Sequence, residues 1–400
     1  LACTPLTSAS GQDIKTLKTM KSCQVPEKSS QGSDMPGCQS SPEPCLHSPD
    51  PDTQVSRSVC HTPSATLPPK GMALPGDRVT RVCSNRPGCV QPLSEKGTQW
   101  FARHPRGMYT CLRTMGPRRL LMLDMHIDRL LTGLDQMTSA EWIQDHGIQT
   151  PHARIKAVLH ERGFDRADTL TKAVVQRYQE CLSVLHPLDT DDLRVSVLVT
   201  SASVDCDMLM VVEYLPPRPP PPYHMQLCPG HRQCPEVKDT HWIRERQKYE
   251  TLVSPPVNEV CLYDTVDGAI SEGLSSNFFA IYPGKEIRTS PAVLIGTMRR
   301  LVLEVAPSLG YKVVPSAPLV HEASDWEGCF VTSTSRRIVP VSLVHMPPYA
   351  IPQTGAGASD GCTDTAAGTG GCDLSLDTSQ AEALDTALAR VLLSRCAPVD

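Results

Sequence analysis

Hydrophobic residues alternate with polar ones, or cluster as β-branched runs, in three stretches of the first half of the chain. This pattern predicts strands over 108–114, 193–200 and 208–214. Between them, apolar residues recur every three or four positions, which is typical of helices with one buried face. One such helix follows an N-cap at Asp124. A second runs from Leu170 to Leu185.

The second half of the chain shows shorter apolar runs with a few helical segments. The expected strands cover 260–263, 277–282 and 328–333. A helix is expected over 297–309, because Gly310 directly after it is a typical C-cap. A last amphipathic helix is expected over 379–395.

Three segments lack such periodicity and divide the chain. The first 75 residues are rich in Ser, Pro, Thr and Gln and bury too little apolar surface to offset chain entropy, so we expect disorder. Pro216–Pro222 is nearly all proline, which predicts a stiff linker. The expected parts are a disordered segment (1–75), an N-terminal α/β domain (76–215), a linker (216–237), a C-terminal domain (238–345), a flexible Gly-rich insertion (346–377) and a C-terminal helix (378–400).

Composition excludes several classes of protein. The net charge of -5 argues against a nucleic-acid-binding protein, since such proteins are usually basic. The absence of a long apolar run argues against a transmembrane helix. The 17 cysteines are scattered without a CxxC pair, so we expect free thiols. Cys228, His231 and Cys234 come nearest to a metal site but lack a second ligand pair, and we expect no metal.

The first residues bear on location. The sequence begins with Leu1 rather than Met, so we expect the N-terminus to be incomplete. We expect a cytoplasmic protein, because the first stretch has no apolar signal-peptide core. The alternative is an organelle, either a plastid or a mitochondrion, since residues 1–30 carry several Lys, Ser and Thr and few acids.

One long motif carries specific chemistry. In Glu259–Ala280, EVCLYDTVDGAISEGLSSNFFA, an acid, a glycine and a short loop lead to Asn and an apolar strand. The segment resembles the signature of class IV aminotransferases, a family that includes branched-chain and D-amino-acid aminotransferases and aminodeoxychorismate lyases. In this resemblance, Glu272 matches the acid that pairs with the pyridine nitrogen of pyridoxal 5'-phosphate. Such an acid keeps the ring protonated, so that the ring acts as an electron sink.

Further segments match the family in the same order. MHIDRL resembles the helix whose arginine grips the cofactor phosphate, which gives Arg129 that role. VLIGTMRRLVLEVA resembles the phosphate-binding helix. There, Thr297 and Met298 would offer backbone N–H groups and Gly296 would allow a close approach. FVTSTSRRIVPV resembles a late loop in which Thr334 and Ser335 would face the phosphate and the substrate carboxylate.

The family's cofactor-bearing lysine lies upstream of the acidic motif, at the end of a strand. Lys238 lies 34 residues before Glu272 (272 − 238) and opens KDTHWIRERQKYE, which is similar to a stretch of plant relatives. Lys248 competes with it, but belongs to a charged run that predicts a solvated helix face. The resemblance therefore implies a Schiff base at Lys238.

The resemblance also implies a fold and an activity. The expected fold is mixed α/β (α+β), of the fold type IV pyridoxal-phosphate enzymes. It has a smaller N-terminal α/β domain and a larger barrel-like C-terminal domain that binds the cofactor. The expected reaction is transamination between an amino acid and a 2-keto acid, carried out by a homodimer. Neither a nucleic acid nor a membrane is an expected partner.

Two positions depart from the aminotransferase pattern. His241 and Trp242 follow the lysine where many members have Asn-Tyr, and Thr110 stands where many have a glutamate. A threonine there is similar to aminodeoxychorismate lyases, which release pyruvate. Thr110 is therefore a candidate catalytic residue, and a lyase is the first alternative. A catalytically inactive binding module is the second, although retention of Lys238 and Glu272 argues against it.

Overall fold

The computed structural model describes residues 79–147, 151–200, 208–346 and 373–399. Contacts divide the chain after Gly71, and every described residue belongs to the second unit, Met72–Asp400. The predicted disordered segment 1–75 lies outside the described residues. The same holds for most of the predicted insertion 346–377.

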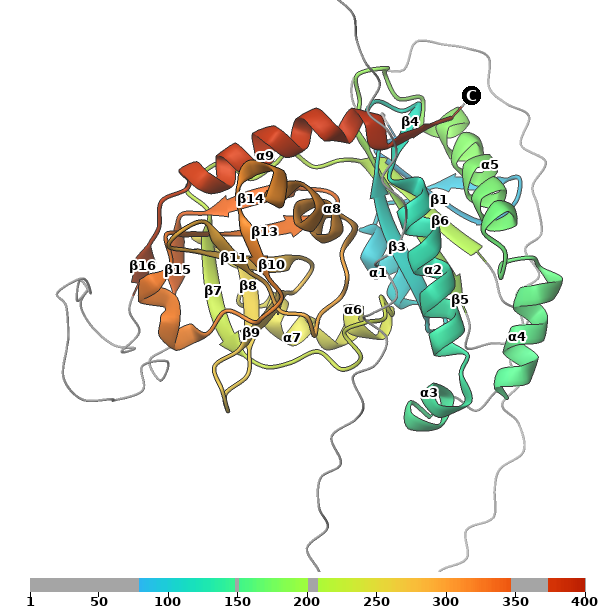
Figure 1. Cartoon of the computed structure of the whole chain (residues 1–400). Helices are drawn as coiled ribbons and strands as arrows, with labels where there is room; N and C mark the ends of the chain where they lie inside the picture. Colours follow the sequence, from blue (N-terminus) through green and yellow to red (C-terminus); the bar gives the residue numbers. More distant parts are fainter. Residues whose placement is uncertain (1–78, 148–150, 201–207, 347–372, 400) are drawn as a thin grey trace, which may run out of the picture. The chain divides into compact units, whose positions relative to one another are not determined.

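The first half of this unit forms a five-stranded antiparallel sheet in the order β2-β1-β6-β5-β3 (Figure 1). Three of these strands were predicted: β5 and β6 at the residues where the structure has them, and β3 displaced by one residue. The strands are β1 (Arg81–Arg86), β2 (Cys89–Pro92), β3 (Gly107–Arg113), β5 (Leu193–Thr200) and β6 (Met208–Tyr214).

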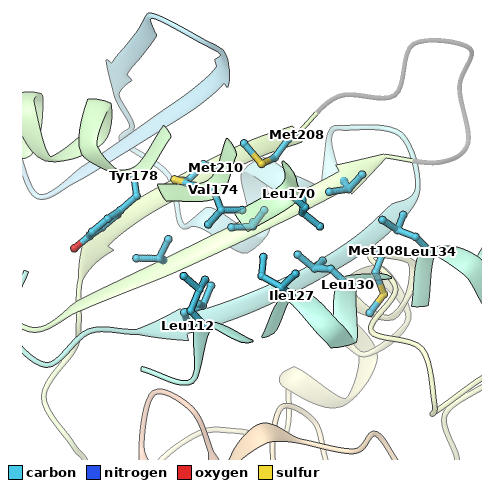
Figure 2. Close-up of a cluster of buried hydrophobic side chains, with 14 of the residues drawn as sticks. Met108, Leu112, Ile127, Leu130, Leu134, Leu170, Val174, Tyr178, Met208 and Met210 are labelled. Carbon is cyan, nitrogen blue, oxygen red and sulfur yellow. The ribbon is translucent and has the colours of Figure 1, made fainter. Parts of the chain in front are cut away.

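Helices cover the two faces of this sheet. Helices α2 and α5 pack on one face, and their apolar sides form a core with the side chains that β3, β5 and β6 point toward them. Figure 2 shows Met108 and Leu112 of β3 on this face, beside Ile127 and Leu130 of α2. The helices of this half are α1 (Gly97–Ala102), α2 (Leu123–Met137), α3 (Ala140–Asp145), α4 (His152–Glu161) and α5 (Ala167–Leu185).

Helix α2 begins earlier than its sequence predicts. The prediction of Asp124 as N-cap is wrong, because Met122 takes that position with a left-handed φ of 50° and Asp124 lies in the first turn. Met122 follows directly on β4 (Arg119–Leu121), which pairs with β17 (Cys396–Pro398) near the C-terminus. The chain must therefore turn sharply at residue 122, a constraint set by a partner strand far away in the sequence.

The second half forms a ten-stranded sheet, in which β13 and β14 branch from β10. Among the described strands its order is the path β12-β11-β10-β9-β8-β7-β15-β16. The strands are β7 (His224–Pro229), β8 (Val257–Tyr263), β9 (Ile270–Gly273), β10 (Asn277–Tyr282), β11 (Glu286–Arg288), β12 (Lys312–Val314), β13 (Gly328–Ser333), β14 (Arg337–Val341), β15 (Leu343–His345) and β16 (Asp373–Ser375).

Short and long helices accompany this sheet. Apolar residues of α8 and α9 share one core with β10 and β13. The helices are α6 (His241–Glu245), α7 (Gln247–Glu250), α8 (Thr297–Val305) and α9 (Ser379–Leu392), with 3-10 turns η1 (Ala306–Leu309), η2 (Val320–Asp325) and η3 (Leu393–Arg395). No helix in the described ranges has the length and apolarity needed to cross a membrane.

Two predicted boundaries change. The range expected as a linker, 216–237, contains β7, which pairs in parallel with β8 and β15, so the extended proline segment ends before His224. The helix expected over 297–309 is α8 followed by η1, since Pro307 has no N–H for an α-helical bond. Gly310, with φ 82°, follows as predicted.

Candidate active site

A cavity of about 500 Å³ is lined by residues of both sheets and of the helices and loops between their strands. The first sheet contributes the odd-numbered residues Tyr109 and Cys111 of β3, and the second contributes Glu272 at the end of β9. The predicted site residues in its wall are Arg129, Lys238, Glu272, Gly296, Thr297, Met298, Thr334 and Ser335.

Lys238 lies between β7 and α6, and its segment is attached to β3. The Tyr109 N–H donates to the Lys238 carbonyl (2.9 Å), and the Thr240 N–H donates to the Gly107 carbonyl (3.0 Å). The Lys238 Nζ lies 4.8 Å from the centre of the Tyr109 ring. Burial lowers the pKa of the Lys238 ammonium, and the nearby guanidinium of Arg129 lowers it further while Tyr109 raises it. A lysine in such surroundings more readily presents a neutral, nucleophilic amine.

Glu272 is buried at the end of β9 and is held by three donors. Arg232 Nη1 donates to its Oε1 (3.3 Å). Asn277 Nδ2 (3.5 Å) and the Leu294 N–H (3.3 Å) donate to its Oε2. Burial raises the pKa of the Glu272 carboxyl, while the charges of Arg232 and Lys238 act in the opposite direction. A further cation beside this carboxylate would therefore be strongly favoured.

The side chain of Thr110 does not line the cavity. Successive side chains of a strand point to opposite faces, so Thr110 shares with Met108 and Leu112 the face of β3 that α2 covers. There Thr110 Oγ1 accepts a hydrogen bond from Arg129 Nη2 and lies 2.7 Å from His126 Nδ1. Thr110 therefore contacts the predicted phosphate ligand, Arg129, and its candidate catalytic role stays a prediction.

These contacts form a chain with a defined direction. Arginine can only donate, and Arg129 Nη2 contacts both Thr110 Oγ1 and His126 Nδ1, the latter at 3.1 Å. Nδ1 is therefore an acceptor, and the Thr110 hydroxyl can give its own proton to it. This leaves the imidazole proton on Nε2, which lies 3.4 Å from Thr297 Oγ1. Burial lowers the pKa of His126 well below its ordinary value, so the ring is neutral, as this chain requires.

The N-terminus of α8 forms another part of the wall. The first N–H groups of a helix have no partner within it, and those of Thr297 and Met298 are at this position. A Cβ on Gly296 would lie 2.2 Å from Asn277 Oδ1, so any larger residue here would require the buried Asn277 side chain to shift. Thr297 Oγ1 lies 3.0 Å from Thr334 Oγ1, which joins this helix end to the late loop.

Ser335 lies beyond Thr334 in the same loop and is half-buried. Its carbonyl accepts a hydrogen bond from Arg113 Nη1 (3.2 Å), and Arg113 also forms an ion pair with Asp192. The end of β3 thus fixes the loop position. Ser335 Oγ lies 3.5 Å from Ser333 Oγ.

A different part of the wall is formed by charged residues of the first sheet. Glu213 is buried and accepts hydrogen bonds from Arg81 Nε (2.6 Å) and Arg194 Nη2 (2.7 Å). All three residues line the cavity, together with Lys96. Two arginines share one carboxylate, so this part of the wall keeps a positive charge.

The sequence from residue 107 to residue 344 matches the family model described as amino-transferase class IV. This match spans more than half of the chain. The chain belongs to the class IV aminotransferase family. The family is one of pyridoxal-phosphate-dependent enzymes, so the predictions of family and of enzyme class are confirmed. A comparison with curated protein sequences found no match.

Solved aminotransferase structures have the same fold as this chain, which confirms the predicted fold class. The branched-chain aminotransferase of Thermoproteus uzoniensis with norvaline is 14% identical, with 80% of this chain and 100% of that chain covered and a TM-score of 0.52. A hypothetical aminotransferase from Mycobacterium tuberculosis in its PLP-bound form is 14% identical, with coverages of 78% and 99% and a TM-score of 0.51. These identities support similarity of fold alone.

The cavity of this class IV aminotransferase fits pyridoxal phosphate. Arg129 Nε is buried without a hydrogen-bond partner among the described residues, as is Thr332 Oγ1, and both residues line the cavity. Burial lowers the pKa of Arg129 to about 10, so it remains a cation at neutral pH. A cationic donor beside a free helix N-terminus is a suitable site for a phosphate.

Several residues of the site escaped the sequence prediction. Arg232 belongs to the run considered for zinc, yet it is buried against Glu272 and its guanidinium lies 5.4 Å from the centre of the Trp242 ring. Asn277 was noted only as the end of the acidic motif, and Tyr109 only as part of a strand. Their positions in the family's motifs were the available signal, but their partners are distant in the sequence.

Proposed function

We propose that this chain is an aminotransferase that transfers an amino group between an amino acid and a 2-keto acid, with pyridoxal phosphate bound to Lys238. One observation carries the proposal: Lys238, Glu272, Arg129 and the N-terminus of α8 line the same cavity. These are the lysine, the acid, the cation and the helix end that this cofactor requires.

The roles of the cofactor-binding residues follow from these positions. Lys238 would bond to the cofactor aldehyde, and Glu272 would contact the pyridine nitrogen. Arg129, with the N–H groups of Thr297 and Met298, would hold the phosphate. The bound cofactor supplies an electron-accepting ring that stabilises negative charge at the substrate Cα. Gly296 and Thr334 would complete the phosphate site, since one allows the close approach and the other bonds to Thr297.

The proton transfers would be carried out by Lys238. Once displaced by the substrate amine, the Lys238 amine would take a proton from the substrate Cα and return it to the acceptor carbon. Burial lowers the pKa of this lysine, which favours the neutral form needed for the first transfer. The backbone bond from Tyr109 keeps the lysine segment against β3, while Ser335 would orient the substrate carboxylate.

A lyase that releases pyruvate is the alternative. That hypothesis depended on Thr110 taking part in proton transfer at the substrate. Because the Thr110 side chain bonds to Arg129 and His126 beneath α2 and is not part of the cavity wall, we favour transamination.

We also propose the domain division 76–215 and 238–345 and a homodimeric assembly. Sedimentation of the full chain would test the assembly, and imaging of the full-length protein would test the cytoplasmic prediction.

The reaction can be tested with a panel of amino acids, each supplied with 2-oxoglutarate, beside aminodeoxychorismate. We expect amine exchange that depends on the keto acid, without formation of 4-aminobenzoate. Borohydride reduction followed by peptide mapping should place the reduced pyridoxyl group on Lys238. Formation of 4-aminobenzoate without amine exchange would reject the transaminase, and an adduct on another lysine would reject the proposed site.

A further inference from the structure

A cysteine–histidine pair lies outside the cavity wall, close to the lysine segment. Cys234 belongs to the loop between β7 and Lys238, and His146 follows the end of α3. The Cys234 Sγ lies 2.8 Å from His146 Nε2, and both residues are half-buried. A thiol within reach of an imidazole is the first requirement for base-assisted cysteine reactivity.

The imidazole of His146 is oriented so that this nitrogen is free to accept a proton. Its other nitrogen, Nδ1, lies 2.8 Å from the Trp142 carbonyl, which can only accept a hydrogen bond. Nδ1 therefore carries the ring proton, and Nε2 accepts the proton of the Cys234 thiol. The ring also stacks on Trp142, with centroids 4.0 Å apart and planes 15° apart. A base oriented by a third group is the arrangement found around activated nucleophiles.

A second observation points to the same thiol. Trp142 is only 6% exposed, and its indole Nε1 is buried. This N–H has no hydrogen-bond partner of normal geometry among the described residues. It is nevertheless close enough to lower the pKa of Cys234. An N–H group with no other acceptor can stabilise negative charge on the sulfur, or on an oxygen added to it.

Burial favours the thiol form of Cys234 in the resting protein. Burial raises its pKa, with smaller contributions from Glu236 and Asp239, while the guanidinium of Arg106 acts in the opposite direction. Arg106 lies 4.6 Å from the centre of the Trp142 ring and pairs with Asp239, the residue after Lys238. Reaction at the sulfur therefore needs a base, and His146 is the neighbour that can take the proton.

We propose that Cys234 is a modification site for small electrophiles and peroxides, with His146 as its general base. With an alkyl halide, the sulfur forms a bond to carbon, the halide leaves, and His146 takes the thiol proton. With a peroxide, the sulfur attacks one oxygen and the O–O bond breaks. The leaving oxygen takes the proton from His146, giving a sulfenic acid together with water from hydrogen peroxide or an alcohol from an alkyl peroxide.

The test is the rate of labelling of individual cysteines in the full-length wild-type chain. Iodoacetamide at pH 7, followed by peptide mass spectrometry, reports Cys234 beside Cys228. Cys228 is a matched control, because it is half-buried in the same region and its thiol donates to the Pro229 carbonyl rather than to an imidazole in the part of the chain that the structure describes. We expect Cys234 to react at least about tenfold faster. Hydrogen peroxide should produce a dimedone-trapped sulfenic acid at Cys234 and none at Cys228.

Two variants separate activation from exposure. His146→Gln keeps a polar side chain but removes the base, and should slow Cys234 labelling about tenfold or more without changing Cys228. Trp142→Phe keeps an aromatic ring and removes the N–H, and should slow it by a smaller factor. Equal rates for Cys234 and Cys228, or an unchanged rate in His146→Gln, would overturn the proposal. Labelling of the buried Cys181 would report unfolding of a variant. In that case, the labelling rates of Cys234 and Cys228 in the wild-type protein test the proposal. None of these readouts depends on the proposed function.

Discussion

Arg232 ties Glu272 to the segment that carries Lys238. Its Nη1 lies 3.3 Å from Glu272 Oε1, and each side chain is only 5% exposed. Its Nη2 donates to the carbonyl of Val237, the residue before Lys238. A single buried guanidinium, 40 residues before Glu272 in the sequence, therefore fixes the acid and the lysine relative to each other.

Replacing Arg232 by Met should destabilise the cofactor-free protein in a pH-dependent way. The pKa of Glu272 is raised by folding, so protonation of Glu272 contributes stability at low pH that is lost as the pH rises through its folded-state pKa. Removal of Arg232 raises this pKa further and leaves a buried charge unpaired at high pH. We expect a loss of about 3 kcal/mol at pH 8 and a clearly smaller loss at pH 5. Urea unfolding at both pH values measures this, and equal losses would contradict it.

Lys238→Ala should abolish the visible absorbance of bound cofactor and reduce amine exchange by at least about 10³-fold, because both the covalent attachment and the proton carrier are lost. Lys248→Ala is the matched control, since Lys248 is exposed and its Nζ lies over the Tyr249 ring, 4.8 Å from its centre. That variant should keep the absorbance and the rate. Spectra and initial rates of both proteins decide the matter, and a coloured, active Lys238→Ala protein would refute the assignment.

Thr110→Val should weaken cofactor binding without slowing the saturated enzyme. Thr110 contacts Arg129 and does not line the cavity, so the valine removes one hydrogen bond that orients Arg129, the proposed phosphate ligand. We expect the dissociation constant of pyridoxal phosphate to rise about tenfold, and about 100-fold in Arg129→Met, where the charge itself is lost. Fluorescence titration gives both constants. A large fall in kcat for Thr110→Val at saturating cofactor would instead restore its candidate catalytic role.

Gly296→Ala should destabilise the protein by about 1–3 kcal/mol, because the new methyl group would meet Asn277 Oδ1 at 2.2 Å. The cause can be isolated with a double-mutant cycle. In an Asn277→Ala background the clashing oxygen is absent, and the cost of the alanine should fall by at least about 1 kcal/mol. Urea unfolding of the four proteins provides the values. Strictly additive losses would mean that the glycine is required for another reason.

The longer elements could be predicted because their side chains follow one period. Strands β5 and β6 and helix α5 each carry a continuous apolar pattern. The two strands form at the predicted residues, and α5 ends at the predicted Leu185 but begins at Ala167 rather than Leu170. Strands of three residues such as β11 and β12 have too few positions to show a period, and they form because they pair with each other. The start of α2 at Met122 likewise depends on β17, which no local pattern contains.

The candidate site divides in the same way. Lys238, Glu272 and Arg129 lie in motifs of adjacent residues, which a sequence displays directly. The buried Arg232 was missed because its importance comes from Glu272, distant along the chain. The face of β3 on which the Thr110 side chain lies could have been predicted. Met108 and Leu112 are alternate residues of the same strand, so they point to the same face, and both belong to the core beneath α2.

The alternation of β3 has a consequence for altering this enzyme by design. Its even-numbered position 110 contacts Arg129, the proposed phosphate ligand, whereas its odd-numbered positions 109 and 111 line the cavity. Substitutions at even-numbered positions would therefore alter the retention of the cofactor. Substitutions at odd-numbered positions would alter the preference for a substrate. The two properties would be adjustable separately within seven consecutive residues.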